Sequence, residues 1–192
     1  MNKSAVGAIV GGVILFVWSY LAWVILPLHE PTLHQIANED AAIQALQLHL
    51  DGKAVYSFPK NPGMSADKSA MNAWTEKVKR GPNGLIVYDP AGVNPMMPGQ
   101  MLYGLILDVL SAWMVCWFLA RSIALNAPYL ARVAYCGMFG IFCSLFTHLM
   151  AWNWMGFPID YTSSMIIDAI VGWLLAGLGI AAIVKAPKLM TT

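Results

Sequence analysis

Charged residues are scarce in this chain of 192 amino acids, and their charges nearly cancel. Asp, Glu, Lys and Arg make up 11% of the sequence and leave a net charge of +1, whereas 58% of the residues are hydrophobic. Soluble domains have an apolar share of about 45 to 50%. The near-neutral charge argues against a nucleic-acid partner, and the apolar excess predicts that the chain's first partner is a lipid bilayer.

Cysteines are few, and all of them, Cys116, Cys136 and Cys143, lie inside apolar stretches. The hydrophilic segment between the first two apolar stretches has none, so no disulfide can stabilise it. This segment also lacks a Gly-rich phosphate loop, a nucleophile motif and paired histidines at metal-ligand spacing. We interpret His29 and His34, on either side of Pro31, as ordinary interfacial residues.

Four apolar stretches are long enough to cross about 30 Å of hydrocarbon at about 1.5 Å per residue. We predict an all-α integral membrane protein, a four-transmembrane-helix bundle with a small α+β loop domain between helices 1 and 2. Helix 1 covers residues 1–27 and is interpreted as a retained anchor, because its apolar run is too long for a signal peptide. The loop domain covers residues 28–99. Residues 100–192 hold the C-terminus and helices 2 to 4, at about 100–120, 129–152 and 162–184.

The basic residues near the helix ends predict the orientation. Both flanks of the long loop, residues 28–45 and 82–100, contain no Lys or Arg. The positive-inside rule therefore places both termini in the cytoplasm and the loop outside. The loop has no N-glycosylation acceptor, which favours a bacterial inner membrane. The basic residues on the cytoplasmic side are Lys3, Arg121, Arg132, Lys185 and Lys188.

The loop domain carries its own start and stop signals. Asn38 can cap a helix with a buried face at Ile43, Leu46 and Leu50, and a short strand follows at residues 55–58. A second helix at about 69–80 is closed by Gly81, and a second strand covers 85–88. We predict a helix–strand–helix–strand cap that leans on the membrane helices, because two short strands are rarely stable alone.

Three ionisable residues, Asp108, His148 and Asp168, lie inside the apolar helices, where such residues are costly and mark candidate functional sites. Counted at about 1.5 Å per residue, they lie roughly 6 to 12 Å below the outer boundary, near Ser19 and Tyr161. Each lies in a stripe of small or polar residues of the kind that lets membrane helices approach closely. The packing residues in these stripes are Gly104, Gly137, Gly140, Gly172 and Ala176, and the first helix has a similar line with Gly7 and Gly11.

Several hypotheses fit this polar cluster. Asp108, His148 and Asp168 can pair with one another and with hydroxyl groups and so fix the helix register. One His and two carboxylates also suit Zn, Mn or non-haem Fe. Proton or ion movement is a third hypothesis, although the inner half of the helices has few polar residues to continue a path. Haem ligation by His148 lacks a second axial ligand.

Two further groups have both an ordinary and a specific interpretation. The junction between helices 3 and 4 is an interfacial anchor or a docking surface for a lipid, a quinone-like ligand or a membrane protein. A methionine group, Met96, Met97 and Met101, either packs at the helix entrance or binds copper(I). The junction residues are Trp152, Asn153, Trp154, Gly156 and Pro158.

No catalytic motif accompanies these features, and the sequence identifies no cofactor. We therefore predict a non-enzymatic accessory or partner-binding subunit of a membrane complex, which associates with another membrane protein or with itself. The alternative is a metal-dependent membrane enzyme or an ion- or proton-handling protein with an outward-facing site at Asp108, His148 and Asp168.

Overall fold

The computed structural model describes residues 2–94 and 97–186, which form two compact units. Among the described residues, the membrane unit contains 2–34 and 97–186, and the loop unit contains 35–94. Four helices in the described part of the chain are long and apolar enough to cross a membrane, which confirms the prediction of a multi-pass membrane protein. These helical spans are Lys3–Ile25, Pro98–Arg121, Tyr129–Met155 and Ile159–Ile183.

Two of the four spans are interrupted by π-helical turns. The first span consists of α1 (Lys3–Tyr20) and a π-helical turn (Leu21–Ile25). The third consists of α5 (Tyr129–Cys143), a π-helical turn (Ser144–His148) and α6 (Leu149–Met155). The second and fourth spans are the continuous helices α4 (Pro98–Arg121) and α7 (Ile159–Ile183). Single π-helical turns shift the phase of the side chains that follow and are frequent at functional sites.

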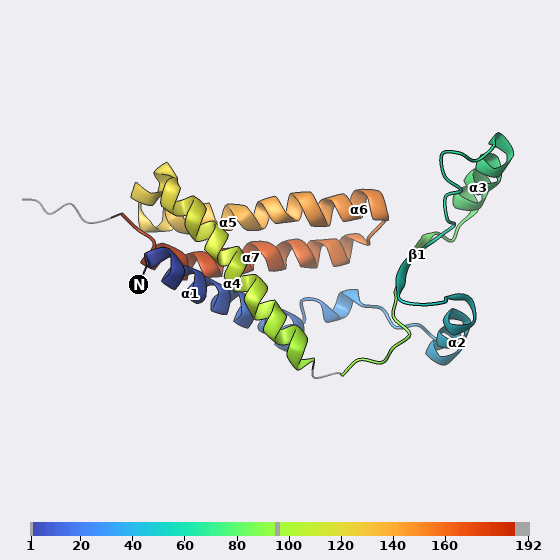
Figure 1. The fold of residues 1–192 in the computed structure, drawn as a ribbon, viewed down its shortest axis with the longest axis horizontal. Coiled ribbons are helices and arrows are strands. Elements are labelled where there is room, and N and C mark those ends of the chain that lie inside the picture. Colours follow the sequence, from blue (N-terminus) through green and yellow to red (C-terminus); the bar gives the residue numbers. More distant parts are fainter. Residues whose placement is uncertain (1, 95–96, 187–192) are drawn as a thin grey trace, which may run out of the picture. The chain divides into compact units, whose positions relative to one another are not determined.

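Helix α1 packs against α4 and α7, and α7 packs against α5, whereas α4 and α5 barely touch each other (Figure 1). Glycines permit two close approaches between helix backbones. A Cβ atom on Gly12 would lie 2.5 Å from the Cα atom of Val109 in α4, and one on Gly140 would lie 2.6 Å from the carbonyl oxygen of Ala169 in α7. The backbones therefore touch where no side chain fits, as expected for helices that associate without a hydrophobic driving force.

Most of the small residues singled out in the sequence also lie in these interfaces. Ala176 is fully buried, whereas a Cβ on Gly104 would reach only Phe16, at 4.0 Å, so Gly104 is not a site of close packing. Gly7, Gly11, Gly137 and Gly172 would each bring a Cβ within 3.0 Å of a side chain on a neighbouring helix.

Side chains in the first turns of α5 donate hydrogen bonds to carbonyl oxygens of neighbouring segments. Arg132 is buried, and its guanidinium donates to the carbonyl oxygens of Ala127 and, at 2.9 Å, Ala181. The Tyr129 hydroxyl donates to the carbonyl oxygen of Leu178, also at 2.9 Å. Arg132 thus ties α5 to the last turns of α7, where a positive charge is favoured by the helix dipole. Two residues named above, Lys188 and Met96, lie outside the described residues.

The loop unit has the predicted order of elements: α2 (Glu39–His49), β1 (Ala54–Phe58), α3 (Lys68–Arg80) and β2 (Gly84–Tyr88). The strands pair antiparallel, with Ala54 opposite Tyr88 and Phe58 opposite Gly84. The side chain of Asn38 accepts a hydrogen bond from the Ala41 amide and so caps α2. Gly81, at a φ of 68°, ends α3.

The loop unit lacks a core of its own, since none of its described residues, 35–94, is buried. The predicted buried face of α2 is wrong at Ile43, which is 44% exposed, although Leu46 and Leu50 are half-buried. The hairpin consists of two strands of five residues each. Such a hairpin is rarely stable alone, because independent stability needs three or more strands or a helix packed on the sheet.

Candidate intramembrane site around Asp168

Asp168, in the first half of α7, is the centre of a polar network between segments far apart in the sequence. The indole Nε1 of Trp18 in α1 donates to Asp168 Oδ1 at 2.6 Å and to the Asp168 carbonyl oxygen at 3.1 Å. The other carboxylate oxygen, Oδ2, lies 3.0 Å from His29 Nε2. An ionised carboxylate can only accept hydrogen bonds, so with Asp168 ionised the Nε2 atom of His29 carries a proton and donates it.

His29 lies in the turn that follows the first span, and its side chain is only 1% exposed. The imidazole ring stacks on Trp23, with ring centroids 3.9 Å apart and an interplanar angle of 11°. Its Nδ1 atom lies 3.3 Å from the hydroxyl oxygen of Ser164, which in turn donates to the carbonyl oxygen of Tyr161. Asp168 and Ser164 are one helical turn apart on α7, so together they hold both nitrogens of one buried imidazole.

The interpretation of His29 as an ordinary interfacial residue is therefore wrong. It is the fully buried partner of Asp168, 139 positions away in the chain. Helical spacing could identify Trp18, because it lies seven residues after Gly11 and hence on the same face of α1. No local spacing could identify His29, because a turn outside the helix brings it back to α7.

His148 lies beside this network without joining it. Together with Trp18, Ser19 and Asp168, it lines a cleft of about 160 Å³. His148 interacts electrostatically with Asp168, but within the described part of the chain its ring makes no hydrogen bond. His148 is the last residue of the π-helical turn in the third span.

The remaining members of the predicted cluster lie elsewhere. Asp108 is half-buried on α4, does not line the cleft, and has no hydrogen bond or ion pair among the described residues. The Tyr161 ring stacks on Phe157, and only its carbonyl oxygen reaches the network. No three His, Cys, Asp or Glu side chains in residues 2–94 and 97–186 form a group that could hold a metal ion. The predicted trio Asp108, His148 and Asp168 is therefore not a ligand set in this geometry.

The junction between the third and fourth spans presents its aromatic side chains outward. Trp152 and Trp154 are exposed, Gly156 adopts a positive φ of 73°, and Pro158 precedes the first turn of α7. Asn153 is exposed as well. Exposed indoles at the end of a membrane helix are typical of interfacial anchors.

In comparisons with known proteins, the chain matches no family model, no curated protein and no solved structure.

Proposed function

We propose that this protein is a non-enzymatic, partner-binding subunit of a membrane complex. We place it in the bacterial inner membrane because the loop has no N-glycosylation acceptor. The distribution of basic residues supports cytoplasmic termini and a loop unit outside. The observation that carries the proposal is the lack of a core in the loop unit, because a partner can supply the layer that the unit itself does not have.

One face of the hairpin is the proposed docking surface. Val55 and Val87 are directly opposite each other on β1 and β2 and are 64% and 84% exposed. Leu85, two residues from Val87 on the same face, is also exposed. We propose that an apolar surface of a partner protein's extramembrane domain covers this face, as the second layer of a sheet sandwich would.

The polar network in the membrane supports a non-enzymatic role. Both carboxylate oxygens of Asp168 are engaged by the chain's own Trp18 and His29, and both imidazole nitrogens of His29 have neighbours. The polar groups of this network find their hydrogen-bond partners within the chain, and we propose that the network holds the turn after α1 against α7.

The test is reciprocal purification of the full-length protein from its native membranes, before and after Val87→Lys. We expect a stoichiometric partner that is lost from the Val87→Lys variant, because a buried lysine would have to be desolvated at the interface. Asn72→Lys, at an exposed position on α3, is the matched control and should retain the partner. The proposal would be contradicted if the unmodified protein and the Val87→Lys variant were both purified from native membranes without any partner.

Proton or ion handling is the second candidate, and the cleft between His148 and Asp168 favours it. The experiment is proton flux into proteoliposomes that contain an entrapped pH-sensitive dye. A flux that His148→Ala abolishes would support this function, because that change removes the one titratable side chain in the cleft that is not hydrogen-bonded. Flux no greater than that of empty vesicles would exclude it.

A further inference from the structure

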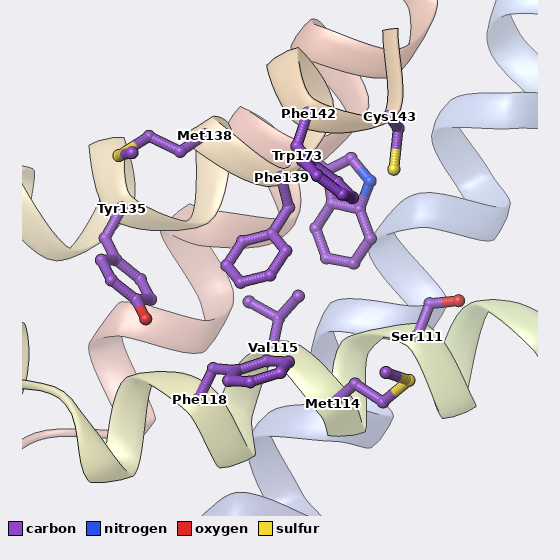
Figure 2. A pocket seen from close by; sticks show the side chains of 10 residues that line it. All are labelled: Ser111, Met114, Val115, Phe118, Tyr135, Met138, Phe139, Phe142, Cys143 and Trp173. Atoms are coloured by element: carbon purple, nitrogen blue, oxygen red, sulfur yellow. The ribbon is translucent and has the colours of Figure 1, made fainter. Parts of the chain in front are cut away.

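Helices α4 and α5 leave an apolar groove of about 590 Å³ between them, within the spans that cross the membrane. We call it the α4–α5 groove (Figure 2). Phe139 is at its centre, with the rings of Phe118, Tyr135 and Trp173 at centroid distances of 5.8, 5.9 and 6.2 Å. Its volume falls within the range of about 300 to 1,000 Å³ that is usual for small-molecule sites.

The lining of this groove differs from that of the helix interfaces. The interfaces within the membrane unit contain glycines such as Gly12 and Gly140, where the backbones touch. The ten residues that line the groove include no glycine and no alanine. Because membrane helices pack through small residues, this lining is poorly suited to a partner helix and well suited to a flat molecule among aromatic rings.

Hydrogen-bond donors in the groove have no partner within the described residues. Ser144, Thr147 and Thr162 all donate to a carbonyl oxygen four residues earlier in their helices, as hydroxyls in membrane helices commonly do. Ser111 makes no such bond, and the indole N–H of Trp173 also has no acceptor. Both residues line the groove, and Figure 2 shows Ser111 on the same helix as Met114 and Trp173 beside Phe139.

Ser111 is exposed and Trp173 is half-buried within the protein, so in a membrane both donors would face hydrocarbon. Ser111 and Trp173 are each ten residues from the end of their span, about 15 Å at 1.5 Å per residue, which places them near the middle of the bilayer. No water is present there to accept their hydrogen bonds. A saturated acyl chain would fill the groove but offer these donors no acceptor, whereas a ring with carbonyl oxygens carries hydrogen-bond acceptors.

We propose that the α4–α5 groove binds a quinone-type lipid, whose flat ring lies among the aromatic side chains and whose carbonyl oxygens accept hydrogen bonds from Trp173 and Ser111. The apolar tail would leave the groove towards the surrounding hydrocarbon. This site is separate from the proposed docking face of the loop unit, so either proposal can fail without the other.

The test measures binding of decylubiquinone to the full-length protein in phospholipid nanodiscs. We expect saturable binding that Trp173→Phe weakens about tenfold, which corresponds to the loss of about one hydrogen bond while the ring is kept. Trp154→Phe is the matched control, because Trp154 is an exposed indole that does not line the groove. This variant should bind decylubiquinone with the affinity of the unmodified protein. Should Trp173→Phe fail to fold, Ser111→Ala removes the other donor at a residue with no hydrogen bond to lose.

Two results would overturn the proposal. The first is the absence of saturable decylubiquinone binding, with phospholipid as the only lipid that co-purifies from native membranes. The second is equal affinity in the unmodified protein, Trp173→Phe and Ser111→Phe, since the larger Phe side chain should obstruct the groove.

Discussion

The membrane unit and the loop unit reach their structures by different means. The membrane unit has few charges, yet contacts between residues more than a hundred positions apart hold it together, such as the bond of Trp18 to Asp168. The loop unit has most of the charged residues and its structure is local: caps, turns and a hairpin, without a buried residue in 35–94. Local signals therefore suffice to form helices and strands, whereas a core requires partners far apart in the sequence.

The largest effect that we expect is a difference in amide hydrogen exchange between the loop unit and the membrane unit. Amides of α2 and the hairpin should exchange about a thousandfold faster than those in the middle of α5 and α7, because few contacts oppose local opening of the loop unit. Exchange followed by mass spectrometry in nanodiscs measures both units in one sample. Equal protection of both units in the isolated protein would mean that the loop unit has a stable core, contrary to the lack of buried residues in 35–94.

Removal of the Asp168 carboxylate should cost the membrane unit the most stability. Asp168→Leu leaves Trp18 and the buried His29 without their acceptor, and we expect a loss of about 2 to 4 kcal/mol in the free energy of unfolding. Asp168→Asn keeps an acceptor for Trp18 and should cost about 1 kcal/mol. Thermal unfolding of the detergent-solubilised protein measures both changes.

The control for this series is Asp108→Asn, at a carboxylate with no hydrogen bond or ion pair among the described residues. We expect little change in the unfolding temperature there. If Asp108→Asn and Asp168→Leu destabilised the protein equally, the effect would reflect any change at an intramembrane carboxylate and not the network around Asp168.

The sequence predicted well what depends on local pattern. Hydropathy located the four spans, Asn38 and Gly81 marked helix ends, and helical spacing singled out Gly140 and Asp168. These features depend on neighbours within one or two turns of the chain.

Partners could not be predicted in the same way. Spacing gives the face of a helix but not how that helix is rotated against the next one, so Asp108 and Asp168 could be assigned to one cluster although they lie apart. The π-helical turn Ser144–His148 shifts His148 out of phase with Gly140, which no composition rule reveals. His29 arrives from a turn outside the helices, so its pairing with Asp168 depends on the whole fold.

Close helix packing should be the next most sensitive feature. Gly140→Ala places a Cβ 2.6 Å from a carbonyl oxygen of α7, and we expect a loss of about 1 to 3 kcal/mol from the forced separation of the helices. Gly104→Ala is the same change where the nearest atom is 4.0 Å away, and it should be neutral or slightly stabilising, because alanine favours the helix. Thermal unfolding compares the two variants. Equal destabilisation would show that the close contact between α5 and α7 at Gly140 does not determine the stability of the membrane unit.

The smallest effect that we expect is confined to the loop unit. Lys53 Nζ lies 2.7 Å from Asp89 Oδ2, one residue beyond the paired ends Ala54 and Tyr88. The hydrogen bond from Lys53, and secondarily that from the Ala91 amide, lowers the pKa of Asp89, and the carboxylate in turn raises the pKa of Lys53. The folded hairpin thus favours the charged form of both groups.

The direction of the pH effect follows from these shifts. Because the pKa of Asp89 is lower in the folded hairpin, its contribution to stability is complete above the unfolded value of about 4 and is lost as the pH falls through the folded value. The contribution of Lys53 is complete below about 10 and is lost at higher pH. NMR shifts of the Val55 and Val87 methyl groups should therefore change below pH 4, and Asp89→Asn should remove that change while it keeps an acceptor for the Ala91 amide. An unaltered acid response in Asp89→Asn would assign it to other carboxylates, whereas a response that spread to α5 and α7 would mean that the two units do not respond to pH independently.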